Sequence, residues 1–349
     1  MAETKREIVG DLCHDIIIEN IKPKLSYSGK RNFDKWRKQL KDKLVELTGM
    51  DKVMQNAAEN PEFMIEEDVV KDGYRRIRFT FFSEIGSLVP CYLLVPLTGK
   101  KTYPLAITLQ GHSTGFHNSI GEAKSEDDLN YITTRGDFAV QAVKEGYCAL
   151  CVEQRCMGER VTSRHTFEKH MCSYPSLAAI LLGRTVIAER CFDISRAIDM
   201  MSNFDFVDKD KILITGNSGG GTTSFYAACF DERIKISAPS CAFCSYEKSI
   251  LLKRHCACNY IPSAFNWFEM YDLAALIAPR DLIIIAGKED PIFNIKGVKK
   301  GFSVAKKIYS KIDAENNVKL FVTPKAHYWC KDIVWNSINT RAEELGWLK

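Results

Sequence analysis

Short apolar runs alternate with amphipathic stretches along most of the chain. The runs are rich in β-branched residues, are too short for helices and are bounded by turn residues, which is typical of buried strands. The stretches between them repeat apolar residues at helical spacing. The predicted strands are 105–109, 147–152, 211–215, 234–238, 282–286 and 318–323, and the helices between them include 138–145, 185–202 and 296–312.

A different pattern precedes these runs. Residues 74–82 alternate between apolar and polar side chains, as a half-exposed strand does, and 88–95 can form its antiparallel partner. This pair brings the predicted sheet to eight strands. Because strands and helices alternate after the pair, we expect a mostly parallel eight-stranded α/β sheet with helices on both faces.

The first 70 residues predict an N-terminal helical extension. Five apolar side chains recur there at helical spacing among lysines, namely Phe33, Trp36, Leu40, Leu44 and Leu47. We expect this stripe to dock on the main domain, with binding to a partner subunit as the alternative. No repeat or Pro/Gly-rich linker divides the rest. Residues 71–349 are therefore expected to form one domain, with an insertion at 240–278.

Composition favours small-molecule chemistry. The chain has 349 residues, of which 46% are hydrophobic, enough to fill a large core. A formal net charge of +4, with 26% charged residues, is too mild to indicate binding to nucleic acid or a membrane. The amino terminus has no apolar signal segment, so we expect a cytoplasmic protein whose thirteen cysteines are reduced. A homo-oligomer is compatible with these features.

The sequence Gly-Asn-Ser-Gly-Gly at 216–220 lies between a predicted strand and a predicted helix. In that context G-x-S-x-G is typical of a nucleophile elbow, in which a tight turn leaves the hydroxyl of Ser218 exposed above the sheet. The alternative is a glycine-rich turn whose serine caps the helix. Residues placed later in the chain favour the elbow.

An elbow serine needs a histidine as base and an acid that orients this base. Asp290 follows the predicted strand 282–286, and His327 follows 318–323. This gives the chain order Ser, Asp, His that such hydrolases use. A turn-forming role for Asp290 and a surface role for His327 are the alternatives. The predicted catalytic triad is Ser218, Asp290 and His327.

The oxyanion hole should use two backbone amides. One is that of Gly219, next after the nucleophile, and the other belongs to the glycine-rich turn after strand 105–109. The amide of His112 is our choice there, with Ser113 as the fallback. The His112 ring is also a rival base, but it precedes the nucleophile in the chain.

Two cysteine pairs in the insertion raise the question of a metal. Cys241 and Cys244 have zinc-ligand spacing, but Cys256 and Cys258 are separated by a single residue, which suits such a site poorly. We therefore expect free thiols and no metal or cofactor. His165, His170 and Cys172, in the long segment after strand 147–152, are further candidates to line the cleft.

Several blocks of the chain resemble the acetyl xylan esterase and cephalosporin C deacetylase branch of the α/β hydrolases. The resemblance covers roughly residues 74–329, and it implies that fold and the triad and oxyanion positions named above. Two departures are the cysteine at 156, where relatives usually have glycine, and Gln110, where histidine is common. The blocks are Gln-Gly-His at 110–112, Gln-Arg-Cys-Met-Gly-Glu at 154–159, Leu-Gly-Arg-Thr at 182–185, Asp-Ile-Ser-Arg-Ala-Ile-Asp at 193–199, Gly-Asn-Ser-Gly-Gly-Gly at 216–221 and Gly-Lys-Glu-Asp-Pro-Ile-Phe at 287–293.

These features predict a metal-free serine esterase. Its substrate is expected to be a short-chain ester, acetyl by the resemblance, of a carbohydrate or a similar small polar alcohol. One alternative is a serine peptidase related to the catalytic domain of the prolyl oligopeptidases, although no propeller-length region precedes the domain. The other is a non-catalytic binding module that has kept the hydrolase fold.

Overall fold

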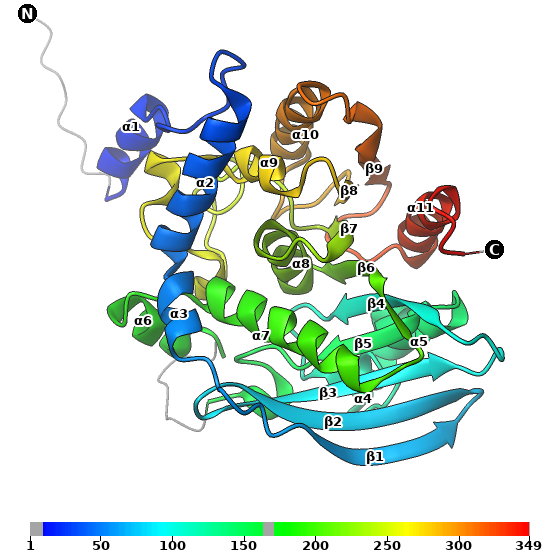
Figure 1. The fold of residues 1–349 in the computed structure, drawn as a ribbon. Helices are drawn as coiled ribbons and strands as arrows, with labels where there is room; N and C mark the ends of the chain where they lie inside the picture. The colour runs from blue at the N-terminus through cyan, green and yellow to red at the C-terminus, as the bar shows by residue number, and fades with distance from the viewer. Residues whose placement is uncertain (1–9, 163–170, 349) are drawn as a thin grey trace, which may run out of the picture.

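In residues 10–162 and 171–348, which the computed structural model describes, the strands form one sheet in the order β1-β2-β3-β5-β4-β6-β7-β8-β9 (Figure 1). Neighbouring strands from β5 to β9 in this order are parallel. The pairs β1–β2, β2–β3 and β3–β5 are antiparallel. The strands are β1 Met64–Lys71, β2 Tyr74–Glu84, β3 Ser87–Pro96, β4 Tyr103–Leu109, β5 Cys148–Val152, β6 Val207–Asn217, β7 Ile234–Ser240, β8 Asp281–Gly287 and β9 Val318–Thr323.

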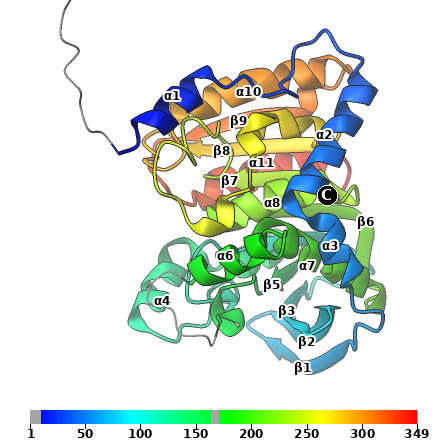
Figure 2. The same cartoon turned by 90° about the vertical axis from the view of Figure 1, so that its left-hand side faces the viewer.

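Helices cover both faces of this sheet (Figure 2). Their bounds are α1 Leu12–Asn20, α2 Phe33–Thr48, α3 Met50–Gln55, α4 Glu126–Tyr131, α5 Phe138–Lys144, α6 Ser173–Leu181, α7 Val186–Met200, α8 Gly219–Phe230, α9 Ala274–Ile277, α10 Ile295–Ser310 and α11 Lys331–Glu344. The arrangement confirms the predicted α/β-hydrolase fold.

The apolar residues of the parallel strands divide between two cores. In β8, Leu282 and Ile284 join the core that includes α2, α7, α8 and α10. Ile283 and Ile285 join the core that includes α5 and α11. Successive side chains of a strand point to opposite faces, so a strand covered on both sides must be apolar throughout. This is why continuous apolar runs identified these strands from the sequence.

Among the described residues the sheet has nine strands, one more than predicted. The additional strand, β1, begins within the predicted extension, which is therefore not helical throughout, and it pairs with β2 at the edge of the sheet. Its side chains are mostly exposed, so it carries no apolar face that a pattern could reveal. Ion pairs from three β2 arginines hold it instead, joining Arg75 to Asp68, Arg76 to Glu67 and Arg78 to Glu66.

The apolar stripe of the N-terminal extension packs within the chain. Trp36, Leu40 and Leu44 of α2 are buried in the core that contains α8 and α10. The Trp36 indole donates to the carbonyl of Leu25 over 2.7 Å, and Lys41 Nζ donates to the carbonyl of Cys229 over 2.6 Å. The extension is therefore anchored to the α/β domain by both apolar and polar contacts.

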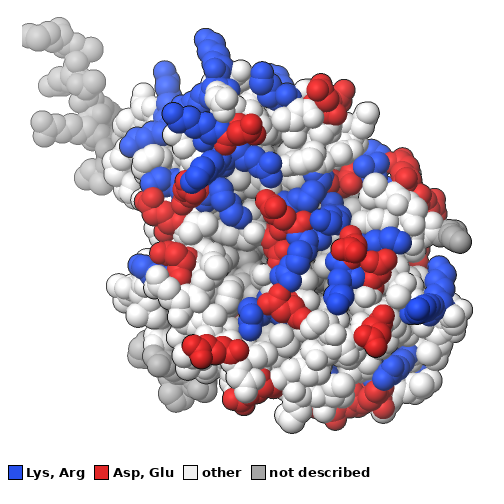
Figure 3. Space-filling view, in the orientation of Figure 1, with Lys and Arg blue, Asp and Glu red and all other residues white. Residues whose placement is uncertain are grey.

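Charged side chains of both signs share the surface. On the face drawn in Figure 3, lysine and arginine gather over the upper part, where α2 lies, and mix with acidic residues below. Within the described part of the chain, none of the helices has the length and apolar character that a membrane crossing requires.

Candidate active site

Ser218 occupies the turn between β6 and α8. Its backbone has φ 55° and ψ −119°, a conformation that a residue with a Cβ adopts only at a cost. The turn packs against the end of β4. A Cβ built on Gly216 would lie 2.4 Å from the Leu109 carbonyl oxygen, and one built on Gly220 would lie 2.1 Å from it. Both flanking positions therefore require glycine, as a nucleophile elbow does.

Asp290 and His327 follow the carboxyl ends of β8 and β9 and contact each other. His327 Nδ1 lies 2.8 Å from Asp290 Oδ2. The other carboxylate oxygen, Oδ1, accepts hydrogen bonds from the amides of Ile292 at 2.8 Å and Phe293 at 3.0 Å. Burial acts to raise the pKa of Asp290, but the hydrogen bond to His327 and these amides outweigh it and lower the pKa below its usual value. Asp290 is thus held as a carboxylate that faces the imidazole.

Ser218 borders a cavity of about 170 Å³ that Phe293 also lines. The Phe293 ring stacks on His327 with ring centroids 6.0 Å apart and an interplanar angle of 15°. No hydrogen bond joins Ser218 to His327, both of which the structure describes. Contacts of this kind are often long until a substrate binds. The structure brings Asp290 and His327 into direct contact and places Ser218 in a cavity beside them.

The two predicted oxyanion donors flank Ser218. A Cβ built on Gly111 would lie 3.3 Å from Ser218 Cβ, so the turn that carries His112 packs directly against the elbow. In residues 10–162 and 171–348, the amides of His112 and Gly219 donate no hydrogen bond to another protein group. Gly219 is the first residue of α8, so its amide has no acceptor within the helix, and both amides are available to donate to a developing oxyanion.

Gln110, one of the departures from the resemblance, ties this turn to the end of β5. Its side chain donates to Glu153 Oε1 over 2.7 Å, and its carbonyl accepts from Gln154 Nε2 over 2.6 Å. Glu153 is fully buried, and burial raises its pKa to about 7. The other departure, Cys156, has φ 71°, a left-handed conformation that suits the glycine usual at this position.

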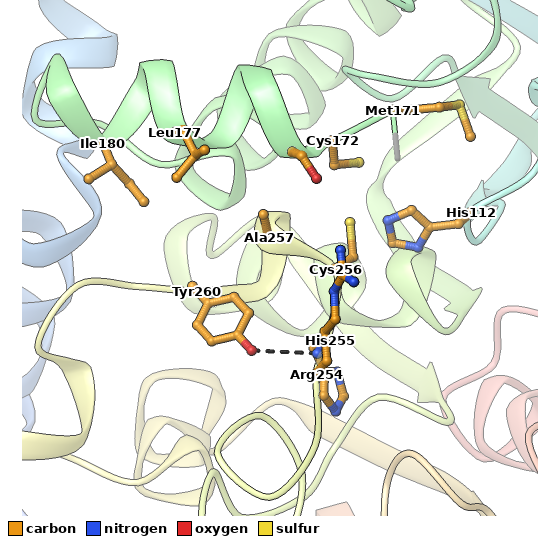
Figure 4. A pocket seen from close by; sticks show the side chains of 11 residues that line it. His112, Met171, Cys172, Leu177, Ile180, Arg254, His255, Cys256, Ala257 and Tyr260 are labelled. Carbon is orange, nitrogen blue, oxygen red and sulfur yellow. Dashed lines mark hydrogen bonds between the residues drawn. The ribbon is translucent and has the colours of Figure 1, made fainter. Parts of the chain in front are cut away.

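The insertion supplies much of the cavity wall, and sequence reasoning did not identify the residues that do so. Lys253, Arg254, His255 and Asn259 line the cavity of Ser218. A larger cavity of about 780 Å³ lies next to it and shares His112, Arg254, His255 and Cys256 with it (Figure 4). The position of the insertion between two strands indicated that it could line the site. The sequence of a loop has no periodicity, however, and so does not show which of its side chains face the cavity.

Of the insertion's aromatic residues, only some reach a cavity. Tyr260 lines the larger cavity. Trp267 instead packs against the main core, where Lys24 and Lys43 lie over its ring. Phe265 also packs against the core.

The structure separates the two cysteine pairs of the insertion. Cys241 lies beside Asp290 and His327, and burial raises the pKa of its thiol to about 12, so it stays protonated. Cys244 contacts the carbonyl of Asn294. Cys256 and Cys258 instead meet Cys172 and His112. His165 and His170 lie outside the described residues.

The fold and the arrangement of Ser218, Asp290 and His327 at the carboxyl edge of the sheet define an α/β hydrolase. Residues 5–236 match the model of the Abhydrolase family, and the chain belongs to that family. It is 27% identical over 215 residues to the "Putative hydrolase YtaP" of Bacillus subtilis (strain 168), covering 60% of this chain and 68% of that protein.

The solved structures that share the fold include two esterases. One is the "putative acetyl xylan esterase (BF1801)" from Bacteroides fragilis NCTC 9343, with a TM-score of 0.71, 18% identity, and coverage of 93% of this chain and 84% of that one. The other is a carbohydrate esterase family 15 glucuronoyl esterase from Caldicellulosiruptor kristjansonii, with a TM-score of 0.60, 18% identity, and coverage of 95% and 92%.

Proposed function

We propose that this protein is a serine esterase that hydrolyses short-chain esters of a carbohydrate or similar small polar alcohol. The observation that carries the proposal is the hydrogen-bonded pair of His327 and Asp290 beside the strained turn of Ser218. The cavity at Ser218 is also lined by His112 and Gly219, the two proposed oxyanion donors. The family and the esterase structures that share the fold support the same class of reaction.

The proposed reaction has two stages. His327 Nε2 removes the proton of Ser218 as Oγ attacks the ester carbonyl, and the amides of Gly219 and His112 donate to the resulting oxyanion. Asp290 holds Nδ1–H and stabilises the imidazolium. The alcohol then leaves with the proton from His327, and water, activated by the same imidazole, hydrolyses the acyl-enzyme. The products are a carboxylic acid and an alcohol, and no metal takes part in these steps.

The size of the cavity supports a short acyl group. About 170 Å³ surrounds Ser218, whereas the adjoining cavity of about 780 Å³ has room for a larger alcohol. Overfilling a rigid wall costs about 1–3 kcal/mol, which corresponds to roughly tenfold to a hundredfold in rate. We therefore expect a steep fall in kcat/KM as the acyl chain lengthens beyond a few carbons.

A uronic acid ester is the second candidate substrate. Lys253 and Arg254 line the cavity of Ser218, and these two side chains can donate hydrogen bonds to the hydroxyl and carbonyl oxygens of a uronate ester, whose esterified carboxyl group carries no charge. The glucuronoyl esterase that shares the fold is consistent with such a substrate. A Lys253→Ala variant should lose kcat/KM for a uronate ester while keeping it for p-nitrophenyl acetate.

The test is an ester panel run on the wild type and on Ser218→Ala. The panel contains p-nitrophenyl acetate, butyrate and octanoate, acetylated xylo-oligosaccharides, a methyl glucuronate ester and a peptide amide. We expect acetate to exceed octanoate in kcat/KM, and Ser218→Ala to lose several orders of magnitude in kcat with an unchanged melting temperature.

The same panel separates the alternatives. Cleavage of the amide with inert esters would make the protein a peptidase. Absence of any turnover, together with no covalent labelling of Ser218 by a fluorophosphonate probe, would leave a binding module. Substantial hydrolysis by Ser218→Ala would refute the assignment of the nucleophile.

A further inference from the structure

Four metal-ligating side chains converge at the wall between the two cavities. They are His112, Cys172, Cys256 and Cys258, and their ligand atoms all lie within 4.8 Å of one another. Cys258 Sγ is 3.3 Å from His112 Nε2 and 3.4 Å from Cys256 Sγ. In Figure 4 the side chains of Cys172 and Cys256 and the His112 ring point toward one place. We propose that these four residues bind one zinc ion in a structural site.

The distances suit a tetrahedral ion. Zinc–sulfur bonds of about 2.3 Å and zinc–nitrogen bonds of about 2.0 Å give tetrahedral edges of about 3.5–3.8 Å between ligand atoms. The Cys258–His112 and Cys258–Cys256 distances, 3.3 and 3.4 Å, are close to these values. A disulfide requires sulfur atoms about 2.05 Å apart, so the Cys256–Cys258 contact is not a bond of that kind. Three cysteines and one histidine form a common closed zinc set with no position left for a substrate.

The charge of a buried arginine points to the same ion. The side chain of Arg190 is buried, and its Nη1 and Nη2 lie 3.5 Å from the sulfurs of Cys258 and Cys172. Among the described residues no carboxylate pairs with Arg190, whose other contacts go to the carbonyl of Arg155. Neutral thiols would leave this buried charge uncompensated, at a cost of several kcal/mol. Zinc with three thiolates and a neutral imidazole carries one negative charge, which balances that of Arg190.

The ligands come from three segments that lie far apart in the sequence. His112 belongs to the turn after β4, Cys172 precedes α6, and Cys256 and Cys258 belong to the insertion. The apolar cluster at this place is small, consisting of Cys156, Cys172, Val186 and Cys258 with Cys256 packed against it. Metal coordination would therefore stabilise the packing of these segments where little apolar surface is buried. Bound metal ions stabilise small folds in the same way.

The site also touches the proposed oxyanion hole. A Cβ built on Gly219 would lie 3.0 Å from both Cε1 and Nδ1 of His112, so the imidazole packs on the residue after the nucleophile. Zinc bound at Nε2 would fix this ring and with it the backbone of His112. Positioning of the oxyanion donors by zinc depends on the proposed function, whereas the binding of zinc itself does not.

Binding requires deprotonated ligands. The three thiols lose their protons to solvent as three zinc–sulfur bonds form, and the neutral imidazole binds through its lone pair. No oxidation accompanies the step. We expect the protein, purified without an affinity tag from zinc-supplemented cells, to contain about one zinc per chain.

The test combines elemental analysis with cobalt substitution. Protein stripped by a strong chelator under reducing conditions is titrated with Co²⁺, which should bind at about one equivalent with intense sulfur-to-cobalt charge-transfer absorption and the visible bands of a tetrahedral ion. Added Zn²⁺ should abolish these bands. This part of the test needs no variant and no substrate, so its outcome is independent of the esterase proposal.

Variants assign the ligands. Cys258→Ser and the less buried Cys256→Ser should both reduce bound zinc to well below one per chain. Cys244→Ser is the matched control, because Cys244 is equally buried in the same insertion but lies outside the four-residue set. It should keep a full equivalent. Wild-type protein that lacks zinc and gives no thiolate–cobalt absorption would overturn the proposal, as would a loss of zinc in Cys244→Ser equal to that in Cys258→Ser.

Discussion

Asp290→Asn isolates the role of the proposed acid with little change in shape. In the wild type Oδ2 accepts from His327 Nδ1 at 2.8 Å, while Oδ1 accepts from the Ile292 and Phe293 amides. The Asn oxygen can retain the two amide hydrogen bonds, so the loop should stay folded. Its NH₂ group then faces Nδ1, which becomes an acceptor, and the proton moves to Nε2. An imidazole in this tautomer cannot remove the proton of Ser218.

The expected loss in kcat is about 10⁴, or about 5 kcal/mol in the activation free energy, by analogy with other Ser-His-Asp enzymes. KM for p-nitrophenyl acetate should change little, because the carboxylate does not line the cavity. Glu153→Gln is the matched control. Glu153 is also a buried carboxylate at a strand end, but its contacts are with Gln110 and the Phe116 amide. It should lose less than about tenfold. If Glu153→Gln is the more damaging change, the acid is not Asp290.

Two further outcomes follow from buried charges. Arg155→Met removes one of the two arginine partners of Glu84, Asp193 and Glu189, all largely buried, and should lower the free energy of unfolding by about 3–5 kcal/mol. Lys38→Met breaks an exposed pair and should lower it by less than about 1 kcal/mol. Denaturant titration measures both, and equal losses would contradict the reasoning. Because burial raises the pKa of Glu153 from 4.5 to about 7, the folded state binds this proton more tightly than the unfolded state, and stability falls as pH rises from about 4.5 to 7, by on the order of 3 kcal/mol. Melting temperatures at pH 5 and pH 8 should therefore differ more for the wild type than for Glu153→Gln, and parallel behaviour would refute this contribution.

The sequence predicted the elements that burial controls. The parallel strands are apolar throughout because helices cover both of their faces, and β9 has the predicted bounds, 318–323. The elbow and the order of Asp290 and His327 were readable because each follows a strand whose end is marked by turn residues. The edge strand β1 was missed because ion pairs hold it, and these leave no apolar period in the sequence.

The proposed zinc site could not be predicted from the sequence, for a different reason. His112 and Cys258 are 146 positions apart, and the fold alone brings them together. The spacing of Cys256 and Cys258 argued against a ligand pair when Cys241 and Cys244 were taken as their partners. The insertion instead directs the two pairs to different places, which depends on packing that local spacing does not report.

The backbone conformation of Ser218 lowers the stability of the folded state. A conformation with positive φ costs a residue with a Cβ about 1–3 kcal/mol, and glycine would adopt it with little strain. A chain selected for thermal stability alone would carry glycine at 218, as it does at the three positions that follow. Serine at this position therefore makes the fold less stable than glycine would, and the strained turn is consistent with the proposed role of its hydroxyl as the nucleophile.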